Sequence, residues 1–426
     1  MADAGRAEFE ELGGLRHDEK GRQVVRALRL AVMLEQALEV GGGFQQPLND
    51  LLWLRDWAAK SGNEIEVYSP YPKTIEVLKE FGVTARLLKF GVLDYLFLFL
   101  KYCRPFDLAQ IVLKWKSPFE RALIRDGIDV VHFTSTSKRH LLLYELPFIV
   151  TIFDGCHRDA PEFPEVRTFG EFERREILFS LASTKAAVVI VNAPDLIDDL
   201  SRRYAMERDR AVCIPFSPSA YVSQSTPAAD EDAAVLTKYR LEPGYLFYPA
   251  QFWPHKNHMT LLAALTRLRE RGVIERLVLC GSDRGGRDKI DAAIQSYGLS
   301  DQVSIIGFVE SAELGALYRG AAALVMPSYF GPTNLPPLEA WAVGTPVIYP
   351  EAFKVQAGDA AILFDYDDAR SLADAIVSLR IEGTRERLRE AGYRRLAQFA
   401  EETKAGQAEF ARHLERLRRR LALTPH

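Results

Sequence analysis

Between residues 329 and 346 the chain reads Tyr329-Phe330-Gly331-Pro332-Thr333-Asn334-Leu335-Pro336-Pro337-Leu338-Glu339-Ala340-Trp341-Ala342-Val343-Gly344-Thr345-Pro346. An apolar run at residues 321–326 precedes this segment and predicts a buried strand, and a second apolar run follows at residues 346–348. The proline-rich loop leads into a short helix expected at residues 335–343, which Gly344 ends. A strand, an irregular loop and a helix N-terminus in that order are typical of an anion-binding site in an open parallel sheet.

Three residues stand at the expected beginning of this helix, and one acidic residue lies about a turn inside it. Thr333 and Asn334 occupy the predicted N-cap, where amides and side chains would point toward a ligand, and Leu335 follows them. Glu339 could accept hydrogen bonds from sugar hydroxyls, as an acidic residue does on ribose in dinucleotide folds. A capped helix with a solvated glutamate explains the same pattern without any ligand.

Two parts of this segment resemble the signature of a known family. The matching runs are Leu335-Pro336-Pro337-Leu338-Glu339-Ala340 and Gly344-Thr345-Pro346-Val347-Ile348. They are similar to the motif of the retaining glycosyltransferases often called family 4, or glycosyl transferases group 1, which have the GT-B fold. Family members have a glutamate where this chain has Gly331. The replacement, Phe-Gly-Pro-Thr-Asn, resembles a subgroup that acts in cell-surface polysaccharide assembly.

Apolar segments alternate with helical patterns along most of the chain, whose 426 residues suit two domains. Strands are expected at residues 28–34, 64–68, 85–88, 129–133, 147–153, 186–191, 211–214, 245–248, 276–280, 303–306, 321–326, 346–348 and 361–364. Such alternation implies an α/β fold with parallel, doubly wound sheets. Together with the resemblance, it predicts a GT-B fold: two Rossmann-like domains facing across a cleft, with a C-terminal helix that crosses back to the N-terminal domain.

Composition shifts suggest where the domains end. Residues 1–23 are charged, have no apolar signal-peptide core, and are expected to be loosely ordered. An N-terminal acceptor domain is expected at residues 24–218 and a C-terminal donor domain at residues 231–400. A segment rich in Ser, Pro and Ala, at residues 217–230, links them, and the crossing helix occupies residues 401–426.

The overall composition excludes some functions. A formal charge of −4 argues against a general nucleic-acid binder, and 48% apolar residues supply two cores. The four cysteines are scattered without metal-type spacing, so we expect reduced thiols and a cytoplasmic protein.

Glycines follow the first predicted strand, at the place where a phosphate could approach the backbone. Gly41, Gly42 and Gly43 precede a helix expected at residues 47–60. Such glycines also form ordinary turns. In the resembled family, a glycine pair here faces the donor phosphate and the acceptor, and Gly42 and Gly43 match that pair.

A polar loop follows the strand expected at residues 147–153. It carries Asp154 and His157, and strand ends of this kind are where ligands bind in open α/β sheets. The segment is similar to the family loop that faces the reacting sugar. The resemblance therefore implies that Asp154 and His157 contribute to catalysis, with His157 near the sugar C6 hydroxyl or the acceptor. A loop histidine that caps a turn is the alternative.

The strand expected at residues 245–248 is followed by Trp253-Pro254-His255-Lys256-Asn257-His258, which looks like the donor loop of the family. Lys256 at the mouth of a helix would neutralise a diphosphate leaving group, so we assign it both a catalytic and a donor-binding role. A solvated lysine is the alternative. Family members carry an arginine five residues earlier, where this chain has Gln251; His255, Arg284 or Arg287 could compensate. Val309, in Gly307-Phe308-Val309, is expected to contact the nucleotide base through its backbone; a simple strand-ending turn is the alternative.

One segment departs from the alternating background. Residues 91–100 are apolar on nearly all sides, and lysines and arginines lie on both sides of them. The run is too short to span a bilayer but could lie in the interface of an anionic membrane. The hypothesis is that the protein is peripheral on the inner face of the membrane, where it reaches a lipid-linked acceptor. A helix buried under the N-terminal sheet is the alternative.

The resemblance implies a retaining transfer of a sugar from a GDP- or UDP-sugar to a glycan or glycolipid acceptor, with mannose from a guanosine diphosphate donor preferred. No acidic pair has metal-ligand spacing, so no metal and no other cofactor is expected. Three alternatives stay open: a nucleotide-sugar epimerase, a phosphorylase, and a catalytically silent relative that acts as a binding partner in an assembly complex.

Overall fold

The computed structural model describes residues 16–17, 23–24, 26–36, 42–101, 110, 112–223 and 229–423. The chain divides into two compact units. The first unit comprises Met1–Phe153, Glu176–Ile214 and Lys404–His426, and the second comprises Asp154–Arg175 and Pro215–Thr403. Apart from a two-residue antiparallel pair, β1 (Arg16–His17) with β2 (Gln23–Val24), the expected loose N-terminus lies outside the described residues.

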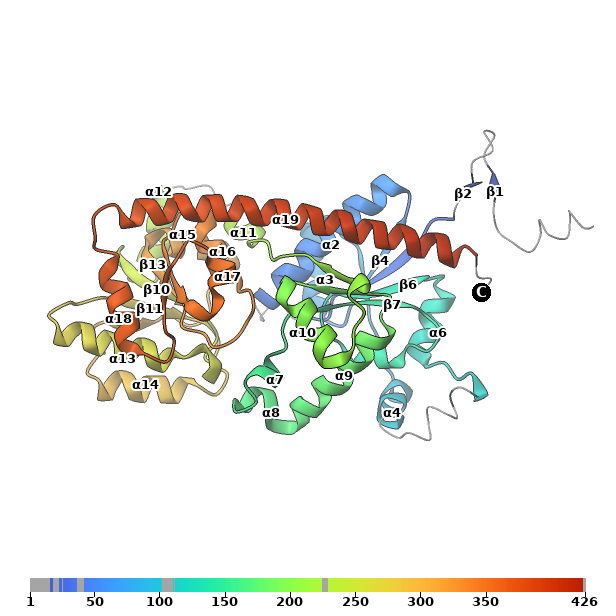
Figure 1. Ribbon diagram of the computed structural model, residues 1–426, viewed down its shortest axis with the longest axis horizontal. Coiled ribbons are helices and arrows are strands. Elements are labelled where there is room, and N and C mark those ends of the chain that lie inside the picture. The colour runs from blue at the N-terminus through green and yellow to red at the C-terminus, as the bar shows by residue number, and fades with distance from the viewer. Residues whose placement is uncertain are drawn as a thin grey trace, which may run out of the picture. The chain divides into compact units, whose positions relative to one another are not determined.

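The first unit is built on a seven-stranded sheet whose strands are all parallel (Figure 1). The strands are β3 (Arg29–Met33), β4 (Glu64–Ser69), β5 (Ala85–Leu87), β6 (Val130–Phe133), β7 (Phe148–Ile152), β8 (Val188–Val191) and β9 (Ala211–Cys213), in the order β5-β4-β3-β6-β7-β8-β9. Successive residues of β3 pack into different cores, Leu30 and Val32 on one face and Ala31 and Met33 on the other. Both faces are therefore covered by helices, which confirms the predicted doubly wound sheet.

The helices of this unit are α2 (Gly42–Ser61), α3 (Pro72–Glu80), α4 (Val92–Leu100), α6 (Pro118–Arg125), η2 (Lys138–Leu142), most of α9 (Glu171–Lys185), and α10 (Pro194–Tyr204). α2 begins five residues earlier than expected, at Gly42. The two glycines thus form the first turn of the helix, and the expected glycine loop is wrong for them. Pro47 lies inside the helix.

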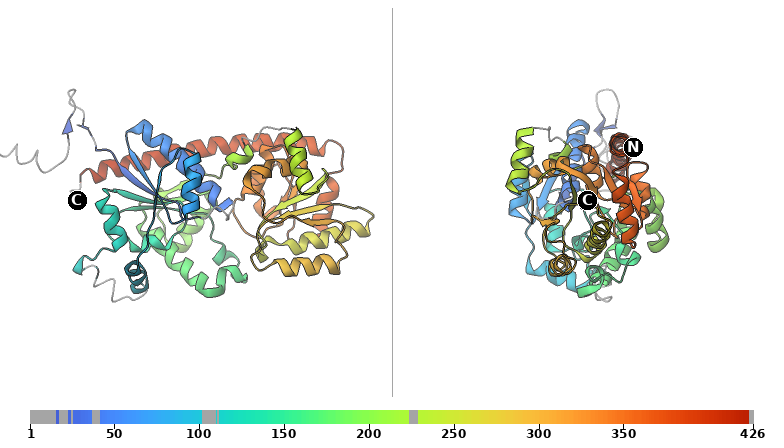
Figure 2. Two further views of the ribbon diagram at one scale, coloured as in Figure 1. Left: turned by 180° about the vertical axis from the view of Figure 1, so that it is seen from behind. Right: turned by 90° about the vertical axis from the view of Figure 1, so that its left-hand side faces the viewer.

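The second unit has a six-stranded parallel sheet in the order β12-β11-β10-β13-β14-β15. Its strands are β10 (Tyr245–Pro249), β11 (Leu277–Cys280), β12 (Val303–Ile305), β13 (Ala321–Val325), β14 (Val347–Pro350) and β15 (Ile362–Phe364). The main helices are α12 (Ala229–Lys238), α13 (His258–Glu270), α14 (Arg287–Ser296), α15 (Leu314–Gly320), α16 (Leu335–Ala342) and α18 (Ala369–Ser378), and they lie on both faces of the sheet (Figure 2). The strand order reverses between the adjacent strands β10 and β13.

Two segments differ from the expected domain plan. The linker expected at residues 217–230 contains α11 (Ala220–Ser223) and the start of α12, whose first turn is acidic and so complements the helix dipole. Asp154–Arg175, expected within the N-terminal domain, packs with the second unit. The polar loop after β7 is therefore part of the same body as the predicted donor residues.

The last helix, α19 (Thr384–Leu421), is 38 residues long and begins in the second unit. Its later part belongs to the first unit, where Phe410 and Leu414 join the core. The Phe410 ring lies 5.8 Å from that of Trp53 and 5.6 Å from that of His132. A Cβ at Gly406 would meet the carbonyl oxygen of Cys213 at 2.1 Å, so only glycine permits this approach. The predicted crossing of the C-terminal helix to the N-terminal domain is confirmed.

Candidate active site

Lys256 lies where β10 gives way to α13. It ends the short 3-10 helix η5 (Pro254–Lys256), and its carbonyl accepts a 2.9 Å hydrogen bond from the hydroxyl of Tyr248 on β10. The next residue, Asn257, adopts φ 55°, which asparagine tolerates better than most residues, and its side-chain amide donates to the carbonyl of Tyr366. The lysine backbone is therefore fixed at the N-terminus of α13.

The ammonium of Lys256 is partly buried and forms no ion pair with any residue that the structure describes. Burial lowers the pKa of Lys256 to about 8, although the Asp154 carboxylate raises it. A pKa near 8 still leaves most of the lysines charged at pH 7. Lys256 thus presents a positive charge with no bonded counterion beside the positive end of a helix dipole, as the sequence led us to expect for a diphosphate ligand.

Glu339 lies on α16, the helix that follows β13. Its side chain is buried, and one carboxylate oxygen accepts a 2.9 Å hydrogen bond from the hydroxyl of Tyr318. Burial raises the pKa of Glu339 to about 7, and the Tyr318 hydroxyl opposes that rise. The second carboxylate oxygen has no partner among the described residues and stays available to a hydroxyl group.

The two residues belong to the same edge of the sheet. Lys256 follows the carboxyl end of β10, and α16 follows the carboxyl end of β13, the strand that pairs with β10 in parallel. This edge is also where the strand order reverses, the usual place of a ligand in an open α/β sheet.

The beginning of α16 differs from expectation. Asn334 is the N-cap residue, but its backbone N–H donates to the side chain of Gln356 at 2.8 Å and its side-chain amide donates to the Tyr349 hydroxyl at 2.6 Å. Both groups therefore face the protein, and the expectation that they point toward a ligand is wrong. Pro336 and Pro337 carry no N–H, so Leu335 supplies the sole amide of the first turn. Thr333 is buried immediately before this turn.

Gly331 owes its presence to the same arrangement. It has φ +107°, which L side chains rarely adopt, and a Cβ there would lie 2.9 Å from Oδ1 of Asn334. Because Asn334 is tied to Gln356 and Tyr349, it has little freedom to move away. A glutamate at this position is therefore incompatible with the observed cap.

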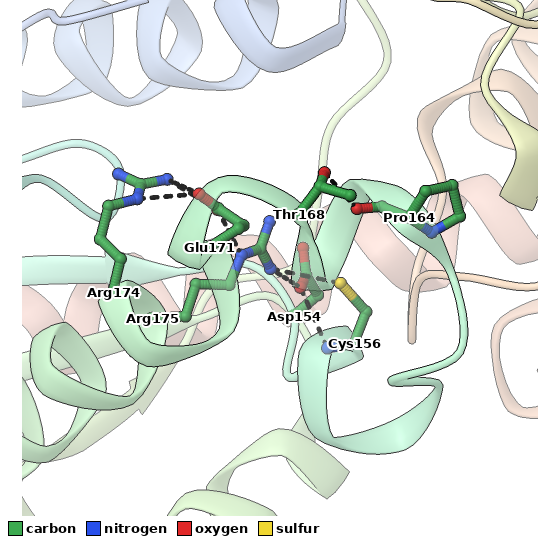
Figure 3. A network of polar contacts seen from close by, with 7 residues as sticks. All are labelled: Asp154, Cys156, Pro164, Thr168, Glu171, Arg174 and Arg175. Carbon is green, nitrogen blue, oxygen red and sulfur yellow. Dashed lines mark hydrogen bonds and ion pairs between the residues drawn. The ribbon is translucent and has the colours of Figure 1, made fainter.

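Asp154 is held in a polar network within the segment after β7 (Figure 3). Its Oδ1 accepts hydrogen bonds from the backbone N–H of Cys156 at 3.1 Å and from Arg175 at 2.9 Å. Burial raises the pKa of Asp154, but Arg175 and Cys156 outweigh it and hold that pKa below its ordinary value. Arg175 also bonds Glu171, so one guanidinium joins two carboxylates. Asp154 is thus an ionised residue that organises this loop and lends negative potential to Lys256.

His157 lies on α7 (Cys156–Asp159) and is fully buried. Its ring packs edge-on against Phe172 at 5.5 Å. In this arrangement His157 exposes no surface to a ligand, so contact with a sugar requires the segment to move. The assignment of His157 to catalysis stays a prediction.

A residue that the sequence did not single out connects this segment to the donor loop. Glu165, on α8 (Pro164–Arg167), accepts a hydrogen bond from the backbone N–H of His255 at 3.0 Å and also contacts Nδ1 of its ring. The imidazole stacks on Phe330 at 4.4 Å, and Phe163 packs against the same phenylalanine. Nothing local marks Glu165, because its partner lies 90 residues away in the sequence.

The three residues considered as substitutes for the arginine missing at position 251 have different surroundings. His255 has a pKa lowered by burial to about 4 and is therefore neutral at pH 7. Arg287 is paired with Asp291 at 2.8 Å. Arg284 lies over the indole of Trp253 at 5.9 Å and forms no ion pair with a described residue, whereas Gln251 accepts from the Trp253 indole N–H. Arg284 is the one of the three that keeps an uncompensated charge.

The remaining predicted residues lie at strand or helix ends. Val309 is buried after β12, while its neighbour Phe308 is exposed beside Gly307, which has φ +75°. Gly42 and Gly43 begin α2 in the first unit, after β3. Within the described ranges, no group of three or more His, Cys, Asp or Glu side chains is arranged to hold a metal ion, and the expected metal independence stays a prediction.

The two parallel, doubly wound sheets and the crossing helix define the class of the protein: it has the GT-B fold. HepE of Anabaena, crystallised with UDP and glucose, superposes with a TM-score of 0.66 at 15% identity over 91% of this chain and 99% of that chain. Residues 236–395 match the family Glycosyl transferases group 1, so the second unit carries a domain of that family.

Curated relatives extend this result. A D-inositol 3-phosphate glycosyltransferase of Corynebacterium diphtheriae is 26% identical over 254 residues, 56% of this chain and 58% of the relative. The O-antigen chain mannosyltransferase B of Escherichia coli is 27% identical over 224 residues, 51% of this chain and 58% of the relative. The chain thus spans little more than half the length of these curated relatives.

Proposed function

We propose that this protein is a glycosyltransferase that moves a sugar from a nucleoside diphosphate sugar to a hydroxyl group of an acceptor. The observation that carries the proposal is the pair of Lys256 and Glu339 at one sheet edge. Lys256 offers an uncompensated cation for the diphosphate, and Glu339 offers a free carboxylate oxygen for a ribose hydroxyl. An anion site and a hydroxyl site beside a strand-order reversal are what a nucleotide sugar requires.

The chemistry consists of separating a diphosphate from the anomeric carbon. As the bond between that carbon and the phosphate oxygen breaks, negative charge grows on the diphosphate, and Lys256 with the N-terminus of α13 stabilises it. Arg284 supplies the second charge in place of an arginine at position 251. The acceptor oxygen bonds to the anomeric carbon on the same face, and its proton passes to the departing phosphate oxygen. The configuration is therefore retained, and no metal ion is needed.

The finer assignments rest on the resemblance and on the relatives. We infer a GDP- or UDP-sugar donor, with mannose as the preferred sugar, which the similarity to an O-antigen chain mannosyltransferase supports. The acceptor is a glycan or a lipid-linked glycan in cell-surface polysaccharide assembly, used at the cytoplasmic face of the membrane. Within the described residues, no helix is both long and apolar enough to traverse a bilayer.

Calorimetric titration with GDP and UDP, followed by a donor panel with and without a glycolipid acceptor, tests the proposal. We expect Lys256→Ala to weaken nucleoside diphosphate binding at least tenfold and Arg284→Gln to weaken it several-fold. Arg287→Gln is the matched control, because Asp291 already neutralises Arg287. Wild-type protein that binds neither nucleotide would contradict the donor site. Binding without transfer to any acceptor would instead favour the catalytically silent binding partner.

A further inference from the structure

α4 places a row of large apolar side chains in solvent. Val92, Leu96 and Phe99, at intervals of four and three residues, are exposed by 85%, 48% and 68% and so lie on one face of the helix. Leu93 and Tyr95 flank this face and are also exposed. A contiguous apolar face is unusual on a water-exposed helix and indicates a binding surface. The alternative expected from the sequence, a helix buried under the sheet, is wrong for this face.

The helix is held firmly while this face remains open. Asp94 and Leu98, on the opposite side, are buried. The Asp94 carboxylate accepts from the backbone N–H of Gly91 at 3.0 Å and from that of Phe119, in α6, at 2.9 Å. Phe90 packs edge-on against Tyr95 at 4.8 Å. The apolar face is thus presented by an anchored helix, at the margin of the first unit in Figure 1.

A second apolar group follows α4 in the chain. Val112, Leu113 and Trp115 are all at least half exposed, and the turn that carries them is closed by a hydrogen bond from the Gln110 side chain to the carbonyl of Trp115. Both views draw this turn and α4 toward the same end of the first unit (Figure 2). We call the exposed side chains of α4 and of this turn the α4 surface.

Positive charges surround the α4 surface. Lys89, Lys114 and Lys138 are exposed, and Lys138 reaches over the ring of Tyr95 at 5.5 Å. Asp94 is the one acidic residue among the described positions from 86 to 116, and its carboxylate is consumed by backbone amides. An apolar helix face with a cationic margin fits the interface of a bilayer that contains anionic lipids. A protein partner of the same charge pattern would need an acidic, apolar groove.

We propose that the α4 surface docks this protein on an anionic membrane, with Val92, Leu96 and Phe99 entering the interface and Lys89, Lys114 and Lys138 meeting lipid headgroups. This proposal deepens the proposed function, because it places the enzyme where a lipid-linked acceptor resides. The docking itself does not depend on the transfer reaction, so the two can fail separately.

Co-sedimentation of the full chain with vesicles tests the docking. We expect binding to vesicles of phosphatidylcholine and phosphatidylglycerol at low salt, and weaker binding at high salt or to phosphatidylcholine alone. Val92→Ser/Leu96→Ser should reduce binding at least tenfold. The matched control is Val355→Ser/Ile381→Ser, which removes two aliphatic side chains with 62% and 64% exposure from the second unit and should bind as the wild type does.

The charge contribution is measured in the same way. Lys89→Gln/Lys114→Gln should weaken binding several-fold and flatten its salt dependence, whereas Lys185→Gln/Lys289→Gln, at exposed lysines elsewhere, should not. All four replaced lysines are exposed, so the variants should fold. Wild-type protein that stays in the supernatant with anionic vesicles at low salt would overturn the proposal. Equal losses in both members of a control pair would also overturn it.

Two further readings separate this proposal from its competitors. Sedimentation velocity without vesicles identifies a second copy of the chain as the occupant: a dimer that Val92→Ser/Leu96→Ser converts to monomer, without vesicle binding, would refute docking on lipid. Nucleoside diphosphate titration of the same variant should match the wild type. Intact nucleotide binding with absent vesicle binding defeats only the docking, and the reverse result defeats only the donor site.

Discussion

Glu165 accepts a 3.0 Å hydrogen bond from the backbone N–H of His255 and contacts Nδ1 of its imidazole. A carboxylate beside Nδ1 keeps the proton on that nitrogen, because burial lowers the pKa of His255 to about 4 and the ring is neutral. Nε2 then carries a lone pair and has no partner among the described residues. The segment after β7 therefore sets both the position and the tautomer of a residue adjacent to Lys256.

Removing the Glu165 carboxylate should loosen the donor loop. We expect Glu165→Ala to lower the free energy of unfolding by about 1–3 kcal/mol, because a largely buried backbone N–H loses its acceptor, and to weaken nucleoside diphosphate binding several-fold. Glu165→Gln keeps an oxygen acceptor and should restore most of the stability. Glu162→Ala, at an exposed glutamate three residues earlier, is the control. Thermal unfolding and calorimetry measure both effects; if both alanine variants behave alike, the contact has no role in positioning.

Most of the fold could be predicted from the sequence, whereas part of the site could not. Runs such as residues 28–34 and 186–191 predicted strands correctly, because a strand covered on both faces must be apolar throughout. Asn334 was correctly expected at a helix start. Its direction was mispredicted, because Gln356, 22 residues later, supplies the acceptor for its amide. Contacts of this kind depend on tertiary packing, which leaves no periodic signal.

The same limit applies to the loop after β7. The sequence marked Asp154 and His157 by their residue types, but the groups that set their surroundings lie elsewhere in the chain. Arg175 reaches Asp154 across 21 residues, and Glu165 reaches His255 across 90. For α4, composition alone left burial and exposure equally possible, and only the packing of Asp94 and Leu98 decides which side faces solvent.

Restoring a side chain at position 331 should destabilise the start of α16. Gly331→Ala is expected to lower the free energy of unfolding by about 2–3 kcal/mol, because it combines positive-φ strain with a displaced Asn334 that loses hydrogen bonds. Gly244→Ala is the control, since Gly244 has φ +95° and open space around its Cβ position. Its cost should be about 1 kcal/mol, the strain alone. Equal costs in chemical denaturation would show that Asn334 yields freely.

Neutralising Glu339 should exchange ligand binding for stability. The pKa of Glu339 is raised by burial from 4.5 to about 7, so the folded state binds the proton more tightly than the unfolded state does. This residue therefore reduces stability progressively as pH rises from about 4.5 to 7. Glu339→Gln should stabilise the protein at pH 8 by up to about 3 kcal/mol, yet weaken nucleoside diphosphate binding by removing a hydroxyl acceptor.

Asp50 provides the matched control for this trade. It is buried in α2 of the first unit, accepts a 2.8 Å hydrogen bond from Gln46, and has a pKa raised by burial to about 7. Asp50→Asn should therefore stabilise the protein at pH 8 in the same way while nucleotide affinity stays at the wild-type value. Loss of affinity in both variants would indicate a general response to buried charge, with no specific role for Glu339.

The pKa of Lys256 predicts how donor binding depends on pH. The ammonium is charged below about pH 8 and loses its proton above that value, so the unliganded protein becomes a poorer anion binder as pH rises. Between pH 7.5 and 9.5 we expect nucleoside diphosphate affinity to fall, approaching tenfold per pH unit at the upper end. Lys256→Arg should bind with little pH dependence over this window, because a guanidinium stays protonated. Lys256→Ala should bind weakly at every pH. Calorimetric titrations across the window measure all three profiles, and a flat wild-type profile at full affinity would show that another group neutralises the diphosphate.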